Sequence, residues 1–496
     1  MKAPLQHRWV RVLGYLAVFV TAFVAVTALA LALRFSADRP VVYQAIEDHF
    51  KYGSTGGERE SGFPLWIFKA LPQVCAEHLP GKGYQSLGFL YEPGSELPIG
   101  MSLRRHRGID RTFLNCAVCH ASTVRESPEA LPRIYLGMPA NTFNLMGFQK
   151  FIFACGRDPK FSKEFIVPEI AHLMQQQGER LGLLDRYLVY PLATWLMRER
   201  LLMLAGRFDW TERQHEWGPG RVDTFNAAKV LFNFRMNELP AAELNGPSDF
   251  PSVWNQRPRQ GMQLHWDGNN TAVEERNKSA AFGTGTTPPT LDRTAIGRIE
   301  EWLLSLPAPA YPFAIDAQLA GRGARVYAQY CAGCHGASAT DFSGEFVGKV
   351  TPLAEVGTDR HRLDSYTYDL AVTQSTLYAG YDWRFSHFRK TFGYANMPLD
   401  GVWLRAPYLH NGSVPTLRDL LEPSGQRPAA FYRGDDVYEL GRVGFRSSVA
   451  AENGRSFFRY DTASPGNSNA GHDGERYGTE LPPADKDALV EFLKTF

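Results

Sequence analysis

The chain lacks an excess of charge of either sign, and it has few cysteines. Its 53 Lys and Arg residues are balanced by 52 Asp and Glu residues, the formal net charge is +1, and no basic run forms a patch. This balance argues against a nucleic-acid-binding protein. A hydrophobic content of 44% with 21% charged residues excludes a disordered or fibrous chain. At about 100–200 residues per domain, the length predicts two or three folded domains.

Long apolar runs are also scarce, and only one is long enough to cross a membrane. Residues 12–33 carry no charge and lie between two arginines. As a helix they would span roughly 33 Å, against a hydrocarbon core of about 30 Å. The basic leader before them places the N-terminus in the cytoplasm and exports the rest. We therefore expect an inner-membrane anchor in residues 1–34 with the bulk of the chain in the periplasm. The alternative is a signal peptide cleaved near residues 28–32, which leaves a periplasmic or secreted protein. A later apolar segment, residues 181–204, is interrupted by five charged residues.

Four of the six cysteines lie in two copies of one short motif. Residues 116–120 read Cys-Ala-Val-Cys-His, and residues 331–335 read Cys-Ala-Gly-Cys-His. C-x-x-C-H is the attachment motif of c-type haem, in which the two thiols bind the porphyrin and the histidine becomes the proximal iron ligand. A thioredoxin-like site does not need the histidine, and a zinc site would need a second Cys/His pair, which is not apparent. We predict two covalent haems. Their ligands would be Cys116, Cys119 and His120 for the first, and Cys331, Cys334 and His335 for the second.

Cys75 and Cys155 are left outside the two motifs. In an oxidising compartment a disulfide between them is the expected state. The alternative is a pair of free buried thiols, because the sequence does not give the distance between them.

The surroundings of the second motif predict a small helical haem domain. Residues 321–336 read as an amphipathic helix that carries the motif and ends at Gly336. The C-terminal residues 482–496 place four apolar side chains on one helical face. A helix with C-x-x-C-H and a closing helix packed across it resemble the cytochrome c fold. The first motif has a matching closing segment at residues 291–306, followed by a proline-rich linker at 307–312.

The predicted fold is therefore mainly α, with two cytochrome c-like haem domains that carry long loop-rich insertions. After the anchor in residues 1–34 we expect an N-terminal haem domain with a large insertion in residues 35–306. The C-terminal haem domain would occupy residues 313–496. Insertions of this size usually build a substrate site or cover the haem.

The axial ligands decide what each haem does, because a five-coordinate iron can bind peroxide or O₂ and a six-coordinate iron transfers electrons. For the second haem the candidate ligands are Met397, His410 and His472. His472 lies in a loop rich in Gly and Asn, where a histidine has no packing role. For the first haem no Met or His stands out. Met138 fits core packing better, which leaves the first iron open.

Two segments resemble the bacterial di-haem cytochrome c peroxidase superfamily. Residues 264–268 read Leu-His-Trp-Asp-Gly, and residues 406–417 read Ala-Pro-Tyr-Leu-His-Asn-Gly-Ser-Val-Pro-Thr-Leu. The second segment, together with a Gly-His pair before the final helix, is most similar to the rubber-oxygenase-like branch. This resemblance implies that the haem on His120 is the reactive one. It also implies that the haem on His335 is six-coordinate with His472 as its second ligand, His410 and Met397 being the alternates.

The resemblance further implies that Trp266 stands between the two haems and relays electrons between them. The alternative role for Trp266 is that of a buried aromatic. The chain departs from the peroxidases at the distal acid, because residues 283–288 contain no carboxylate. Phe282 stands there, where the oxygenase branch places an aromatic. Acid–base cleavage of peroxide needs such a carboxylate, so ordinary peroxidase activity is in doubt. Glu274 and Glu275 lie nearer the tryptophan and are equally consistent with solvated surface charges.

We expect an oxidoreductase of the di-haem peroxidase or oxygenase kind, tethered to the membrane. Its catalytic residues would be Trp266 and Phe282. Its partners would be a small oxidant or O₂ and a redox protein or quinol-linked donor, with no nucleic acid. The alternative is a non-catalytic di-haem electron carrier of a respiratory chain, which the missing distal acid and Met397 would suit.

Overall fold

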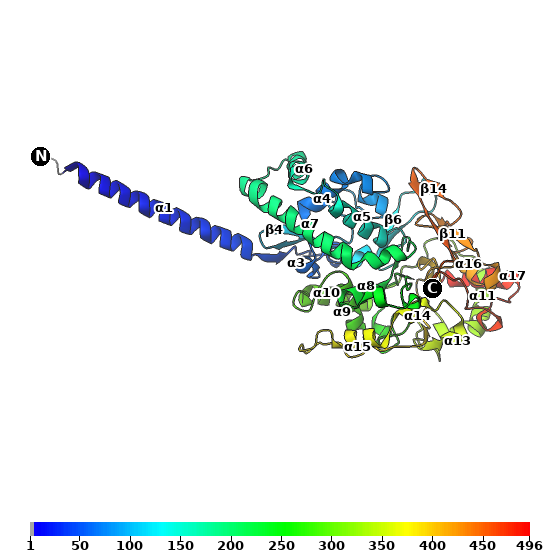
Figure 1. Cartoon of the computed structure of the whole chain (residues 1–496). Helices are drawn as coiled ribbons and strands as arrows, with labels where there is room; N and C mark the ends of the chain where they lie inside the picture. The colour runs from blue at the N-terminus through cyan, green and yellow to red at the C-terminus, as the bar shows by residue number, and fades with distance from the viewer. Residues whose placement is uncertain (1–3) are drawn as a thin grey trace.

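The structure, a computed structural model, describes residues 4–496, and its first helix α1 (Pro4–Ser36) stands apart from the folded body (Figure 1). Among the described residues, the helical stretch Arg8–Ser36 alone is long and apolar enough to cross a membrane, and none of its apolar window is buried. The apolar helix expected at residues 12–33 is confirmed. Its length and composition fit either a membrane anchor or a signal peptide.

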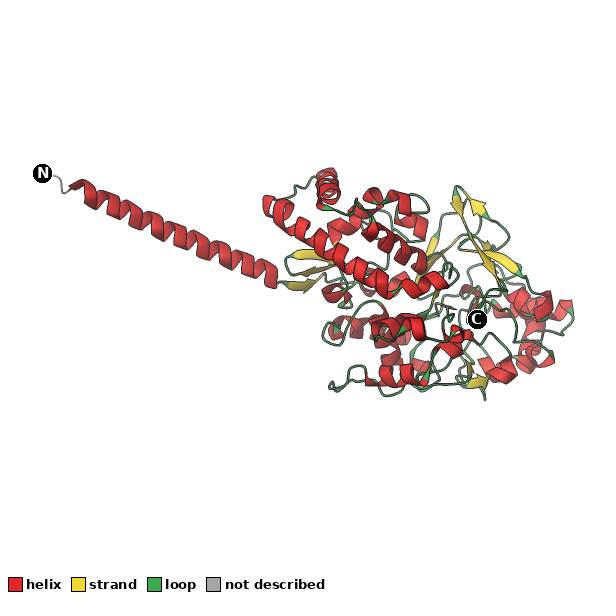
Figure 2. Cartoon of the chain, viewed as in Figure 1, coloured by secondary structure: helices red, strands yellow, loops and turns green. Residues whose placement is uncertain are grey.

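The body combines many helices with small antiparallel sheets and long loops (Figure 2). Helices of all types cover less than half of the chain, so it is helix-rich but not clearly mainly α. The body helices are α2 (Ile46–Tyr52), α3 (Gly57–Glu60), α4 (Leu65–Val74), α5 (Leu145–Arg157), α6 (Lys163–Gln176), α7 (Tyr190–Arg207), α8 (Thr224–Leu231), α9 (Val273–Gly283), α10 (Arg293–Ser305), α11 (Ala317–Tyr330), α12 (Ala332–His335), α13 (Leu353–Val356), α14 (His361–Ser365), α15 (Tyr368–Thr376), α16 (Leu417–Leu420) and α17 (Pro483–Leu493). The strands are β1 (Asp38–Pro40), β2 (Phe63–Pro64), β3 (Arg104–His106), β4 (Ile109–Thr112), β5 (Ala121–Val124), β6 (Arg133–Leu136), β7 (Arg221–Val222), β8 (Ser248–Asp249), β9 (Val350–Pro352), β10 (Gly393–Ala395), β11 (Ala430–Arg433), β12 (Tyr438–Glu439), β13 (Gly444–Phe445), β14 (Ala451–Glu452), β15 (Arg455–Ser456) and β16 (Phe458–Asp461).

The largest sheet fastens the chain to the body directly after α1. It has the strand order β1-β3-β4-β2, and β1 pairs with β3 in antiparallel register, Asp38 opposite His106. The buried Arg104 on β3 forms ion pairs with Asp38 and with Asp292, just before α10. The chain directly after α1 is therefore held in place by strand pairing and by ion pairs.

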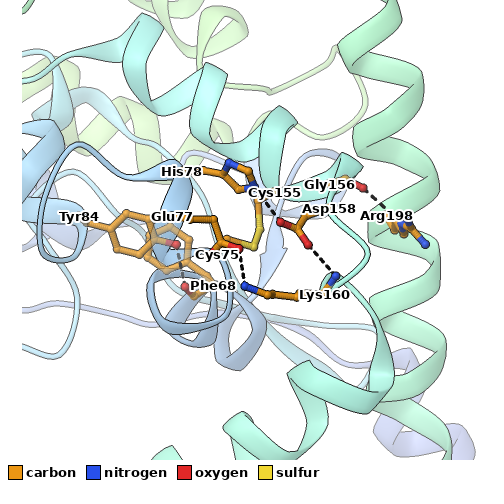
Figure 3. The surroundings of a disulfide bond; sticks show 10 residues. All are labelled: Phe68, Cys75, Glu77, His78, Tyr84, Cys155, Gly156, Asp158, Lys160 and Arg198. Atoms are coloured by element: carbon orange, nitrogen blue, oxygen red, sulfur yellow. Dashed lines mark hydrogen bonds and ion pairs between the residues drawn. A yellow bond between two sulfur atoms is a disulfide. The ribbon is translucent and has the colours of Figure 1, made fainter.

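Helices α4 to α7 share one apolar core, which contains a disulfide between Cys75 and Cys155 (Figure 3). Cys75 follows α4 and Cys155 lies in α5; both are fully buried, with their Cα atoms 5.6 Å apart. The disulfide expected from the sequence is confirmed. Beside it, His78 contacts the carboxylate of Asp158 at 2.8 Å. The bond links two helices that are 80 residues apart in the chain and so restricts the unfolded state.

The second motif has the expected setting of a helix crossed by a closing helix. The motif follows α11 and forms α12, and α17 packs across α11. The crossing is close because Gly323 has no side chain: a Cβ there would lie 1.9 Å from the carbonyl oxygen of Ala488. Tyr327 of α11 contacts Phe492 and Phe496, with ring centroids 5.3 and 4.9 Å apart. The predicted helices at both ends of this region are confirmed.

The first motif, unlike the second, is not carried on an α-helix. Cys116–Val118 form a single 3₁₀ turn that leads directly into β5. The helix that α10 crosses is α2, far upstream, where Phe50 contacts Trp302 at a centroid distance of 5.1 Å. The buried Asn115 joins the motif to α2 by donating to the carbonyls of Lys51 and Gly53. The motif is thus placed by a tertiary contact, which local sequence patterns do not reveal.

The regions assigned from the sequence to two haem domains contact each other along β5. Arg125, just after β5, exchanges backbone hydrogen bonds with Asp436 and Tyr438, and its side chain pairs with Asp436 and Glu452. Met138, expected in the core, is fully buried in an apolar cluster with Trp254 and Trp403. The division at residues 307–312 stays a prediction.

Candidate haem-binding site

His120 of the first motif is oriented by a hydrogen bond from its ring. Its Nδ1 lies 2.9 Å from the carbonyl oxygen of Pro251, so Nδ1 carries the proton and Nε2 keeps its lone pair. Metal-binding histidines are commonly held in this way by a carbonyl on the far ring nitrogen. Burial lowers the pKa of His120 to about 3, which keeps the ring neutral, as iron ligation requires.

His335 of the second motif repeats the arrangement. Its Nδ1 lies 2.7 Å from the carbonyl oxygen of Met397, two residues after the end of β10. Burial lowers the pKa of His335 as well. Both motif histidines therefore present Nε2 as the free ligand atom, which fits a c-type haem at each motif.

His472 faces His335 at the separation that one iron between two imidazoles requires. The two ring centroids are 6.4 Å apart. A metal–nitrogen bond of about 2 Å on each side, plus about 1.1 Å from each nitrogen to its ring centre, gives about 6.2 Å. Burial lowers the pKa of His472 to about 3, and its Nδ1 is buried without a hydrogen-bond partner in the described chain. This spacing fits His335 and His472 as the two residues that would hold the iron of one haem.

The loop that carries His472 is held rigidly. Its backbone N–H donates to Val356, and its φ of 47° lies in the left-handed region. The guanidinium of Arg427 donates to the carbonyls of Asn469, Gly471 and His472 at 2.6, 2.7 and 3.0 Å. Sequence reasoning missed Arg427, because nothing near it in the chain marks it as a loop clamp.

The two alternate ligands have different settings from that of His472. His410 is buried, and its ring stacks on Tyr394 at 4.0 Å between centroids. Its Nε2–H donates to the Tyr394 hydroxyl oxygen at 3.0 Å, because that hydroxyl donates its own hydrogen to the carbonyl of Asp359. Met397 serves through its main-chain carbonyl, on the ring edge of His335 that faces away from Nε2. By contrast, His120, His335 and His472 are each only partly buried.

Trp266 is bonded to both segments that orient the motif histidines. Its indole Nε1 donates to the carbonyl of Asp249 at 2.8 Å, and Asp249 lies two residues before Pro251. Its own carbonyl accepts from Ala395 at 2.9 Å, and Ala395 lies two residues before Met397. His120 and His335 are therefore each connected to Trp266 through one short segment of chain and its hydrogen bonds.

The tight loop around Trp266 explains its fixed position. Leu264 pairs with Asn270 in an isolated bridge, and His265 adopts a φ of 63°. Asp267, which directly follows Trp266, is fully buried and forms an ion pair with the buried Arg362 at 2.9 Å. Trp266 itself is half-buried, so the role of a simple core aromatic describes it poorly.

Helix α9 carries three residues that the sequence analysis considered, namely Phe282, Glu274 and Glu275. Phe282 lies near the end of α9 and stacks on Phe232 at 5.1 Å between centroids; no ring contact with His120 occurs in the described chain. Glu274 is a surface charge paired with Lys278. Glu275 is instead buried and accepts from Asn270, Ser386 and His387, so it is not a solvated surface charge.

Arg276 on α9 is a second residue that sequence reasoning missed. It is buried, and none of the described residues forms a hydrogen bond or ion pair with its guanidinium. Burial lowers its pKa to about 10, and its charge acts on His120 and His265. A buried guanidinium without a counter-ion is costly, so this position calls for an anion beside the first motif. The carboxylates of a bound haem are anions of that kind.

Comparison with known proteins supports part of this assignment. Residues 393–432, which include Met397, Tyr394 and His410, match the family model described as RoxA-like, cytochrome c-like. The chain is 32% identical over 289 residues to the uncharacterized protein y4iM of Sinorhizobium fredii (strain NBRC 101917 / NGR234), covering 50% of this chain and 64% of that protein. It is 27% identical over 374 residues to the uncharacterized protein y4iJ of the same strain, covering 57% of this chain and 61% of that protein. The chain thus spans less than two thirds of the length of either relative.

The matched domain implies a c-type haem and indicates a haem redox protein. It supports the rubber-oxygenase-like branch to which the sequence resemblance pointed. The match lies in the loop region that holds the second motif histidine.

Proposed function

We propose that this protein is a di-haem c-type cytochrome of the peroxidase superfamily that acts as a redox enzyme. The observation that carries the proposal is the paired arrangement of its motif histidines. The Nδ1–H groups of His120 and His335 each donate to a main-chain carbonyl. Trp266 is hydrogen-bonded to both of the chain segments that supply these carbonyls. A haem at each motif would supply one-electron chemistry, and at an open iron the binding of a small oxidant such as peroxide or O₂.

The chain's own residues divide the roles between the two sites. Cys116 and Cys119, and likewise Cys331 and Cys334, would form the thioethers; none of the four is in a disulfide. His472 would close the second site as an electron-transfer centre, because it faces His335 at the spacing that ligation needs. No histidine ring faces His120 at a comparable distance in the described part of the chain. This supports an open first site, where Arg276 supplies the positive charge.

Trp266 would carry electrons between the two sites. Its indole bond to Asp249 and its backbone bond to Ala395 supply the contacts. Phe282 would shape the distal side of the first site, as the family resemblance suggests. The donor would be a redox protein or quinol-linked partner at the membrane, and α1 would tether the body to the periplasmic face of the inner membrane.

A non-catalytic electron carrier is the second candidate. It is favoured by the lack of a carboxylate in residues 283–288 and by Glu275, whose carboxylate is fully engaged by amides and His387. A carrier needs both irons six-coordinate, whereas the enzyme needs one open iron.

Electron paramagnetic resonance of the oxidised protein separates the two candidates. One high-spin and one low-spin ferric signal of equal intensity are expected for the enzyme. Two low-spin signals would favour the carrier. Mass spectrometry of the denatured chain should give the chain plus two haems, and one or none would contradict the proposal.

A further inference from the structure

An exposed apolar tip lies at the start of the long helix α7, in the segment that the sequence marks as apolar but interrupted by charges. Chain residues 185–189 form a π-helical turn that leads into α7. Around this turn, Leu183, Leu184, Tyr187 and Leu188 are 76%, 37%, 71% and 57% exposed. We refer to these four residues as the apolar tip. Adjacent large apolar side chains exposed to this extent commonly mark an interaction surface.

The apolar tip lies beside the point where α1 joins the body. Arg34, in the last turn of α1, forms an ion pair with Asp185 inside the tip segment, and its Nε donates to the carbonyl of Gly108 at 3.3 Å. In Figure 1 the end of α7 that follows α6 lies on the side of the body where α1 enters. The sheet that begins at Asp38 holds the chain immediately after α1, so this junction is fixed.

The ion pair also sets the height of the apolar tip relative to a bilayer. In a chain anchored by α1, Arg34 directly follows the apolar stretch and so lies at the headgroup level. Asp185 is bonded to Arg34 and must lie at the same level. The side chains on either side of Asp185 are therefore within reach of the lipid surface.

The chemistry of the apolar tip suits a lipid surface. Tyr187 is amphipathic, and aromatic residues of this kind concentrate at membrane interfaces. Arg180 and Arg186 are exposed beside it, and the guanidinium of Arg186 lies over the ring of Tyr187 at 5.8 Å. Leucines beside arginines combine burial in the acyl region with attraction to phosphate groups.

We infer that the apolar tip inserts into the periplasmic face of the bilayer as a second membrane contact beside α1. Two contacts fix the rotation of the body about the anchor, which a single helix leaves free. This inference rests on the proposed retention of α1 as an anchor, but not on the haem chemistry.

The test places a single spin label on the full chain in lipid nanodiscs of phosphatidylethanolamine and phosphatidylglycerol. Leu188→Cys reports on the apolar tip, and Val372→Cys is the matched control. Val372 is 64% exposed on α15. In Figure 1, α15 lies at the lower edge of the body, whereas the start of α7 lies at its upper left. In the haem-loaded chain no native thiol competes, because Cys75 and Cys155 are joined and the other four cysteines would be thioethers.

At position 188 we expect collisions with O₂ to rise and collisions with a water-soluble nickel reagent to fall several-fold relative to position 372. Equal accessibility at the two positions overturns the inference. A label at 188 that becomes immobile without gaining O₂ accessibility indicates a protein partner and overturns it too.

The intact mass of the purified chain shows separately whether α1 is retained. If α1 has been removed, the anchor proposal fails. The same two labels are then read with vesicles of the same lipids added. A label at 188 that remains aqueous there overturns the inference, and one that enters the lipid sustains the apolar tip as a membrane contact in its own right.

Discussion

At the scale of single residues, hydrogen bonds and burial distinguish candidate ligands that residue type alone does not separate. The sequence offered three ligands for the second haem, and the structure gives each a different setting. His472 faces His335, His410 is sealed against Tyr394, and Met397 bonds through its backbone. The resemblance had favoured His472, and the geometry supports that choice.

His472→Ala should convert the low-spin ferric signal of the second haem to high spin, because it removes the sixth ligand. His410→Gln and Met397→Ala are the matched controls and should leave that signal unchanged. The wild-type absorption spectrum should also lack the weak sulfur-to-iron band of Met ligation. A loss of that band in Met397→Ala would show instead that Met397 is the ligand.

Burial of neutral histidines makes stability depend on pH. Burial lowers the pKa of His265 to about 4 and that of His410 to about 3. Below the unfolded pKa of about 6.5, the unfolded chain binds protons that the folded chain refuses. Their contribution is therefore fully present above about pH 6.5 and is lost as the pH falls, each histidine costing about 1.4 kcal/mol per pH unit.

The free energy of unfolding, measured with urea between pH 7 and pH 5, should fall less steeply in His410→Gln than in the wild type. Glutamine keeps an N–H donor for the Tyr394 hydroxyl oxygen but binds no proton. The expected difference in slope is about 1.4 kcal/mol per pH unit. Identical slopes would show that His410 takes up its proton in the folded protein as readily as in the unfolded chain.

At the scale of elements, the two motifs differ in how far the sequence predicts them. The pairing of α11 with α17 follows from local patterns, since each helix has its own apolar face and the motif is adjacent to α11. The partner of α10 was not predictable, because α2 is short and its hydrogen bonds to the first motif run through Asn115 and backbone carbonyls. The carbonyls of Pro251 and Met397 are equally invisible in sequence, since any residue type could supply them.

The crossing of α11 and α17 can be tested with two glycines of the same helix. Gly323→Ala places a methyl group 1.9 Å from the carbonyl oxygen of Ala488, so the helices must separate and the protein should lose roughly 1–3 kcal/mol. At Gly321 nothing lies within 4 Å, and Gly321→Ala should stabilise α11 by about 0.5–1 kcal/mol. Thermal unfolding, followed at the Soret band of the bound haem, measures the stability of both variants. Equal effects of the two substitutions would show that the close approach is absent.

At the scale of the whole molecule, hydrogen bonds connect the segments that hold His120 and His335 through one tryptophan loop. Trp266 is bonded to the Asp249 and Ala395 segments, and the neighbouring Asp267–Arg362 pair holds the loop. A second indole, the buried Trp254, also reaches from the Pro251 segment toward the second site, donating to the carbonyl of Asp400 at 3.0 Å. The sequence singled out Trp266 through its Trp-Asp-Gly setting, whereas Trp254 carries no motif. The structure therefore gives two indoles as candidates for one electron route.

Trp266→Phe should slow electron exchange between the two sites by orders of magnitude while both haems stay attached and ligated. Phenylalanine keeps most of the volume, so the cost in stability should be modest. It loses the indole, whose one-electron oxidised state is far easier to reach than that of a benzene ring, and the hydrogen bond to Asp249. Flash-induced reduction of one haem, followed by absorbance at the other, measures the rate. Trp217→Phe, a buried indole that donates to Gln214, is the inert control. If Trp254→Phe slows the exchange and Trp266→Phe does not, the route runs through Trp254. If neither does, electrons pass between the sites without an indole relay.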